Sequence, residues 1–132
     1  MKKVALITTN KILAQSFDSA IQCMENLDFE LILLLNSRQA LLDAEILEID
    51  VALIDIGFID AIDNKLPEKG AALSFCERLH KRLPNCHLLL LFSQDDWVNR
   101  KMATQAKESK IIDDFVFYDA SLKYLLAKLS AF

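Results

Sequence analysis

Hydrophobic residues follow two alternating patterns along the chain: short continuous runs, and longer segments in which they recur every three or four positions. Residues 51–54 (Val-Ala-Leu-Ile) are a run of the first kind, and residues 11–27 are a segment of the second. This alternation is typical of βα units around a parallel sheet. Five units can be counted, so the sequence predicts an α/β fold. We expect strands at residues 4–7, 29–35, 51–56, 87–92 and 112–117.

A helical segment with its own start or stop signal follows each predicted strand. We expect the helices at residues 11–27, 37–47, 70–83 and 97–109, and from residue 121 to the end of the chain. Ser37 can cap the second helix. Ser93, Asp95 and Asp96 can supply N-terminal capping and favourable negative charge at the start of the fourth. Pro84 ends the third helix.

The composition predicts one globular domain over residues 1–132. Hydrophobic residues make up 53% of the chain and charged residues 26%, which excludes a disordered segment. The net charge of −4 argues against nucleic acid as a direct partner, because phosphate binding needs a concentrated basic face. No apolar stretch approaches the ~20 residues of a membrane span.

The cysteines and the N-terminus indicate a cytoplasmic protein. Cys23, Cys76 and Cys86 are odd in number and lack metal-ligand spacing, so we expect unpaired thiols that act as small hydrophobes. The apolar stretch after Met1-Lys2-Lys3 is too short for a signal peptide and predicts the first strand instead.

Polar side chains at the predicted strand ends are the candidates for chemistry. Asp55 ends the third strand, and Ser93 follows the fourth. The chain has only two glycines, Gly57 and Gly70, which argues against a glycine-rich nucleotide site. His80 and His87 lack partners at ligand spacing, so ordinary surface or half-buried histidines are the expectation.

The alternation of five βα units, with Leu53-Ile54-Asp55 after the third strand and a serine after the fourth, resembles the response-regulator receiver domain over essentially the whole chain. The run 112–117 is similar to the receiver segment that leads to the family's lysine. The resemblance implies a flavodoxin-like (βα)5 three-layer fold with parallel strand order 2-1-3-4-5. It places Asp55 at the phospho-acceptor position, Ser93 at the hydroxyl position and Phe115 at the switch aromatic.

This chain departs from the receiver pattern at the positions that support phosphorylation. Thr8 and Thr9 stand where the family has the acidic pair that holds Mg²⁺, and Tyr118 stands where it has the lysine. Neutral hydroxyls are poor substitutes for carboxylate ligands, and a tyrosine hydroxyl brings no positive charge. Asp119 replaces the usual proline, and the loop from residue 57 to 69 is longer than usual.

These departures lead us to expect a pseudo-receiver, a regulatory module that binds other proteins without a phosphorylation cycle and without a cofactor. Two alternatives stay open: a receiver phosphorylated on Asp55 with Mg²⁺, and a small flavodoxin-like enzyme or ligand carrier whose phosphate loop is residues 8–10. Asp55 could also be a structural acid. An unusual metal site could use the following acids: Asp60, Asp63, Asp95 and Asp96.

The resemblance also implies where partners bind. Receivers use the face formed by the fourth helix, fifth strand and fifth helix for dimerisation and for output domains. Trp97, Tyr118 and Tyr124 fall on these elements, and aromatic residues are enriched at interface cores. We therefore expect a protein partner, an output domain or a second copy at this face, and neither nucleic acid nor membrane as a direct partner.

Overall fold

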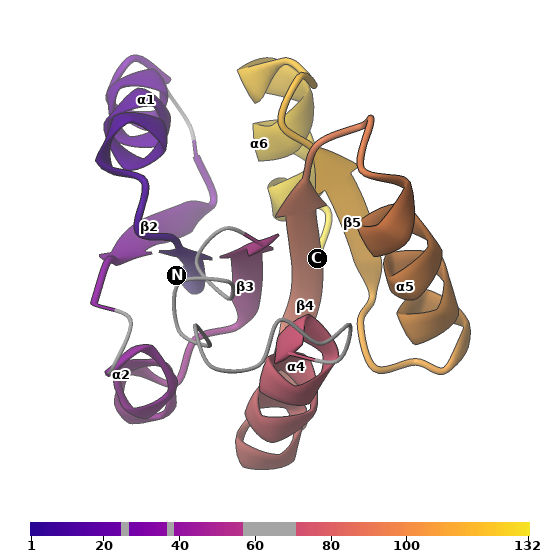
Figure 1. The fold of residues 1–132 in the computed structure, drawn as a ribbon. Coiled ribbons are helices and arrows are strands. Elements are labelled where there is room, and N and C mark those ends of the chain that lie inside the picture. Colours follow the sequence, from indigo (N-terminus) through magenta and orange to yellow (C-terminus); the bar gives the residue numbers. More distant parts are fainter. Residues whose placement is uncertain (25–26, 37–38, 57–70) are drawn as a thin grey trace.

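The computed structural model describes residues 1–24, 27–36, 39–56 and 71–132. Strands and helices alternate along this part of the chain (Figure 1). The strands are β1 (Lys2–Ile7), β2 (Phe29–Leu34), β3 (Val51–Asp55), β4 (His87–Phe92) and β5 (Asp114–Phe117). The helices are α1 (Lys11–Gln22), α2 (Ala40–Leu47), α4 (Ala71–Arg82), α5 (Trp97–Glu108) and α6 (Leu122–Ser130).

The strands form one parallel sheet in the order β2-β1-β3-β4-β5, which confirms the predicted flavodoxin-like topology. β1, β3 and β4 lie inside the sheet, and nearly all their residues are buried. Continuous apolar runs such as residues 51–54 suit this position, because helices cover both faces of the sheet.

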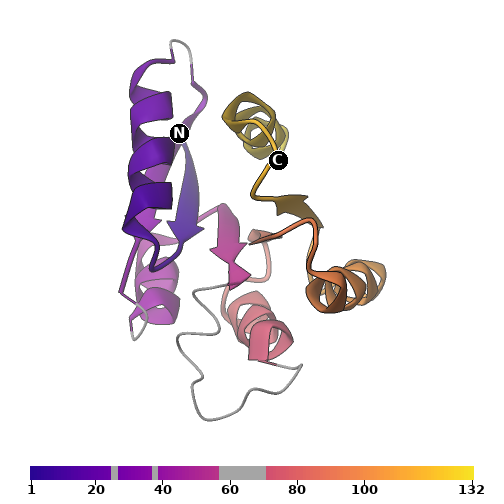
Figure 2. The same cartoon turned by 45° about the horizontal axis from the view of Figure 1, so that its top comes forward.

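Helices cover the sheet in two layers. α1 and α6 pack on one face, where Phe17 and Leu126 join the inner side chains of the strands, and α2, α4 and α5 pack on the other, where Leu79 and Ala103 do the same. Figure 1 shows α1 and α6 above the sheet and α2 and α4 below it. Figure 2 shows α1 and α2 at one end of the sheet and α5 at the opposite end.

Several predicted boundaries were wrong. The first strand begins at Lys2 and not at residue 4, and the second helix begins at Ala40, with Gln39 as its N-cap. The first helix ends at Gln22 and not at residue 27, with Cys23 as its C-cap. The fifth strand begins at Asp114 and not at residue 112. A carboxylate oxygen of Asp113 accepts the Leu88 N–H at 2.8 Å in place of a backbone carbonyl, so the regular pairing starts one residue later.

Ser93 does not cap the fourth helix, contrary to the prediction. Asp96 is the N-cap of α5, and its Oδ1 accepts the Asn99 N–H at 3.1 Å. The Ser93 hydroxyl instead accepts the N–H of Asp95 in the preceding turn, at 3.4 Å. The predicted cap Ser37 lies outside the described residues. Ser121 is the N-cap of α6, and its side chain accepts the Tyr124 N–H.

Cys76 and Cys86 are buried, as expected for small hydrophobes, and burial raises the pKa of each thiol to about 12. Cys23 differs from the expectation because it is exposed. All three thiols are free. Within the described residues, no helix is long and apolar enough to cross a membrane.

Asp114 fastens β5, one edge of the sheet, to the helices on both of its faces. Lys107 Nζ from α5 lies 3.1 Å from Asp114 Oδ1, and Lys128 Nζ from α6 lies 2.5 Å from Asp114 Oδ2. Burial raises the pKa of Asp114, but hydrogen bonds from Lys128, the Phe115 N–H and Lys107 outweigh that effect, so the pKa lies below its usual value. This carboxylate therefore stabilises the fold above the pKa of an unfolded aspartate, and the contribution disappears as the pH falls through the folded pKa.

We predict that Lys128→Met raises the pKa of Asp114 towards 3.8, its ordinary value, because the charged hydrogen bond from α6 is lost. An NMR titration of the Asp114 side-chain carbonyl from pH 2 to 6 measures this shift. Lys123→Met, on the exposed side of the same helix, is the control and should leave the titration unchanged. An identical Asp114 titration in Lys128→Met and in the unsubstituted chain would contradict the assigned anchor.

Candidate functional site

Three predicted site residues meet at the carboxyl end of the sheet. Ile7 pairs with Ile54 in the register of β1 and β3, so the next residues along these strands, Thr8 and Asp55, lie side by side. Tyr118 immediately follows β5. Parallel strands bring their carboxyl ends to one edge, which explains how residues far apart in the sequence reach the same place.

Asp55 is buried and accepts hydrogen bonds from two hydroxyl groups. Its side chain is 3% exposed, and Thr8, which is 0% exposed, donates its Oγ1–H to Asp55 Oδ2 at 2.6 Å. The Tyr118 hydroxyl donates to Asp55 Oδ1. Each carboxylate oxygen thus contacts a neutral donor, and these donors stand at the positions where the receiver pattern has an acid and the lysine.

The backbone holds Thr8 firmly in this arrangement. Its N–H donates to the Leu34 carbonyl at 3.3 Å, and its Oγ1 accepts the Asn10 N–H at 3.0 Å. Asn10 in turn caps α1, with its side-chain oxygen accepting the N–H groups of Ile12 and Leu13. The turn after β1 therefore uses its own side chains to satisfy the first N–H groups of the helix.

Tyr118 reaches Asp55 from a more open position. Its N–H donates to the Phe92 carbonyl at 3.0 Å, which continues the pairing of β4 with β5 by one residue. Its side chain is 42% exposed, in contrast to Thr8. The tyrosine consequently covers the outer side of the carboxylate and lies at the boundary between the site and solvent.

The other predicted site residues do not join this contact. Thr9 and Ser93 are exposed, and no hydrogen bond joins either of them to Asp55 in the described part of the chain. Phe115, at the switch position, is half-buried and packs beside Phe92 and Phe117, with ring centroids 5.5 and 5.9 Å away. Its ring belongs to the core on the α5 side of the sheet.

The donor set at Asp55 does not suit Mg²⁺. This ion favours carboxylate and phosphate oxygens with water in near-octahedral geometry, and two of the described groups that contact Asp55 are hydroxyls that donate their protons to the carboxylate. Within residues 1–24, 27–36, 39–56 and 71–132, no three or more His, Cys, Asp or Glu side chains form a cluster that could hold a metal ion.

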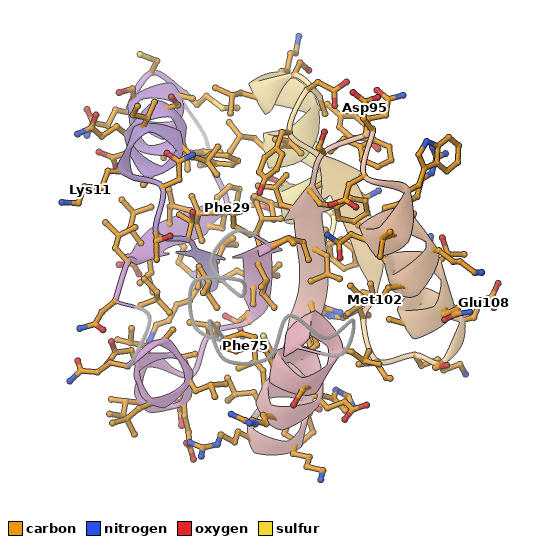
Figure 3. All side chains as sticks on the ribbon, in the orientation of Figure 1. Lys11, Phe29, Phe75, Asp95, Met102 and Glu108 are labelled. Carbon is orange, nitrogen blue, oxygen red and sulfur yellow. The ribbon has the colours of Figure 1, made fainter. Side chains whose placement is uncertain are left out.

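The acids considered for an unusual metal site fall into two groups. Asp60 and Asp63 lie outside the described residues, as does the loop that contains them. Asp96 is committed to capping α5, and Asp95 is exposed in the turn before that helix. Figure 3 shows Asp95 at the outer margin of the molecule, away from β3.

Each histidine has an ordinary environment. His80 is exposed on α4, and His87, at the start of β4, lies with its Nδ1 3.3 Å from Asp113 Oδ1. The partner of His87 was missed in the sequence, because residues 87 and 113 become neighbours only through the pairing of β4 with the segment before β5.

Three exposed aromatic residues lie on the predicted partner face, which is formed by α5, β5 and α6 (the fourth helix, fifth strand and fifth helix of the sequence) and is called the α5-β5-α6 face below. Trp97 at the start of α5 is 73% exposed, and Tyr124 on α6 is 52% exposed. Tyr118, which contacts Asp55, lies between these two helices in the sequence and is also exposed. The Arg100 guanidinium lies over the rings of both Trp97 and Phe117, at 5.4 and 5.6 Å from their centroids.

Solved structures share this fold at low sequence identity. A CheY-like receiver domain protein from Methanospirillum hungatei matches 99% of this chain and 92% of its own length, with 17% identity and a TM-score of 0.71. The chemotaxis protein CheY4 of Vibrio cholerae matches 99% of this chain and 98% of its own, with 16% identity and a TM-score of 0.69. A streptococcal redox sensor, described as evolved from two-component response regulators, matches 99% of this chain and half of its own, with 18% identity and a TM-score of 0.72.

No protein-family model and no characterised protein sequence matches the chain. The structural matches show that the fold is that of CheY-like receiver domains. At this identity the likeness defines the fold, and the function has to be argued from the site.

Proposed function

We propose that the protein is a receiver-like regulatory module that acts through protein–protein contacts without aspartyl phosphorylation. The observation that carries the proposal is the Asp55 carboxylate, which accepts hydrogen bonds from the neutral hydroxyls of Thr8 and Tyr118. In this arrangement Asp55 fastens β3 to β1 and to the end of β5, and its role is structural.

Electrostatics favours this reading over phosphorylation. A phosphoryl group adds close to two negative charges at pH 7, and a cation about 4 Å away contributes about 4 kcal/mol per charge pair near a protein surface. Thr8 and Tyr118 can donate hydrogen bonds to the new oxygens but supply no compensating charge. Phosphorylation of one Asp55 oxygen would also displace the hydroxyl that donates to that oxygen.

The turn after β1 does not suit a flavin phosphate, which the alternative of a flavodoxin-like enzyme or ligand carrier would bind there. A phosphate at this turn would need the free N–H groups at the start of α1. The side chain of Asn10 already accepts the N–H groups of Ile12 and Leu13, and Thr8 accepts that of Asn10. A non-enzymatic module is thus the better fit to this turn.

A beryllofluoride titration tests the absence of a phosphoryl-accepting site. We predict that Mg²⁺ with beryllofluoride leaves the amide NMR shifts of residues 8, 55, 93 and 118 unchanged, because Thr8 and Tyr118, which stand at the positions of the receiver acid and lysine, are neutral. Saturable shifts at Asp55 and Ser93 that disappear in Asp55→Asn would contradict the proposal.

The proposed partner surface is the α5-β5-α6 face, where a different protein or an output domain would bury Trp97. We predict that Trp97→Ala weakens association at this face by about 2 kcal/mol or more, as expected for a central aromatic side chain. The measurement is the affinity for partners recovered with the unsubstituted chain. Ile12→Ala, an exposed apolar residue on α1, is the matched control. Equal affinity in Trp97→Ala and in the control would refute the assignment of this face.

A further inference from the structure

The two edges of the sheet differ in how they are protected. β5 is four residues long, and Asp114 ties it by ion pairs to helices on both faces. β2, at the other edge, is six residues long, and among the described strands its one neighbour is β1. Residues 29–35 read Phe-Glu-Leu-Ile-Leu-Leu-Leu and contain neither lysine nor proline, which are common means of protecting an exposed edge.

The outer side of β2 presents backbone groups that are ready for pairing. The Leu34 carbonyl accepts the Thr8 N–H and therefore points towards β1. Because the direction of the N–H and C=O groups alternates along a strand, those of Leu31 and Leu33 point away from the sheet. No backbone or side-chain group of the described chain hydrogen-bonds to them.

The helices next to β2 cover its faces and leave its edge open. Leu31 and Leu33 pack on the α1 side of the sheet, and Ile32 packs on the α2 side. Figure 1 shows α1 and α2 on either side of β2, and no other helix or strand of the described residues lies beyond it. An extended strand of another molecule can therefore reach the edge without displacing a helix.

We propose that β2 pairs antiparallel with β2 of a second copy, about a two-fold axis at Ile32, to form a continuous ten-stranded sheet. In this register Leu31 of each copy lies opposite Leu33 of the other, and the two pairs exchange four backbone hydrogen bonds. Residues 29–35 pair along their whole length, because position 29 lies opposite position 35.

Charge also favours an identical partner in this arrangement. Glu30 is the only charged residue in 29–35, and the two-fold places it opposite Leu34 of the other copy, so like charges do not face each other. A two-fold contact is closed and yields a dimer, not a filament. The dimer uses the edge opposite β5, so the α5-β5-α6 face stays available for a different protein.

Sedimentation equilibrium of the full chain, from 5 µM to 0.5 mM, tests the proposal with a matched pair of variants. The mass expected for the unsubstituted chain rises towards twice 15.0 kDa with concentration. Leu33→Pro removes one outward N–H and keeps the bonds to β1, so the dissociation constant should rise at least tenfold. Leu33→Ala loses the same side chain but keeps the N–H, so it should still dimerise.

Two further measurements make the outcome decisive. The dimer should persist in Trp97→Ala, and a dimer lost in that variant would place the contact at the α5-β5-α6 face and overturn the proposal. A monomer at 0.5 mM, or a dimer that persists in folded Leu33→Pro, would also overturn it. If Leu33→Pro does not fold, hydrogen exchange of the unsubstituted chain tests the proposal instead. The Leu31 and Leu33 amides should exchange more slowly as the protein concentration rises if β2 pairs. Exchange rates that do not depend on concentration would reject the pairing.

Discussion

The triple variant Thr8→Asp, Thr9→Asp and Tyr118→Lys is expected to lose stability without Mg²⁺ and to recover much of it when Mg²⁺ is added. Thr8 Oγ1 lies 2.6 Å from Asp55 Oδ2, so aspartate at position 8 places two carboxylates together in a buried site. An uncompensated buried charge costs about 3–5 kcal/mol, and two adjacent carboxylates also repel each other.

Mg²⁺ reverses this loss because it binds the folded state alone. At a concentration one hundred times its dissociation constant, a ligand of this kind adds about 2.7 kcal/mol of stability. The melting temperature of the triple variant should therefore rise by several degrees with Mg²⁺, whereas that of the unsubstituted chain should not change. Position 9 is exposed, so its aspartate adds a ligand at the solvent side of the ion.

A double and a single substitution separate the contributions in this variant. Thr8→Asp with Thr9→Asp should recover Mg²⁺-dependent stability, because the two substitutions supply the ligands. Tyr118→Lys alone should gain no response to Mg²⁺, because it supplies a charge but no ligand. Equal melting temperatures of the triple variant with and without Mg²⁺ would show that the receiver correspondence does not transfer to these positions.

Thr8→Val should destabilise the protein by about 1.5–3 kcal/mol, which is the cost of removing a hydrogen bond to a charged group. The substitution keeps the shape of the side chain and leaves Asp55 Oδ2 without the Thr8 donor in a buried position. It also removes the acceptor of the Asn10 N–H. The free energy of unfolding from urea titration at pH 7 measures the loss.

Two other substitutions calibrate this loss. Tyr118→Phe should cost about 1 kcal/mol or less, because Tyr118 is 42% exposed and water can replace its hydroxyl at Asp55. Thr104→Val is the matched control: its hydroxyl donates to the Arg100 carbonyl in its own helix at 2.8 Å, and its side chain is exposed. If Thr8→Val cost no more than Thr104→Val, Asp55 would not depend on the buried hydroxyl.

The alternation of strands and helices could be predicted from the sequence because the buried strands are continuous apolar runs. Residues 51–54 and 87–92 are apolar at almost every position, a pattern typical of strands inside a helix-covered parallel sheet. The order of the strands was predicted from the resemblance to receiver domains. The end of α1 and the start of β5 were less predictable, since each depends on local hydrogen bonds at Cys23 and Asp113 that no periodicity reveals.

The site was predicted only in part, because spacing shows which strand ends meet but not which hydroxyl faces the carboxylate. Thr8 and Tyr118 both contact Asp55, whereas Thr9, next in the chain, is exposed. Strand geometry could have suggested this difference, since successive side chains point in opposite directions. The Asn10 cap was also readable: an asparagine directly before a helical segment is a common N-cap.

The most direct test of the central claim is the intact mass of the protein after incubation with acetyl phosphate and Mg²⁺. We predict that the mass does not change, because Thr8 and Tyr118 supply no charge to balance a phosphoryl group on Asp55. The triple variant carries the missing charges and serves as the positive control, and Asp55→Asn is the negative control. A phosphoryl adduct on the unsubstituted chain that is absent in Asp55→Asn would contradict the account and establish a phosphorylated receiver.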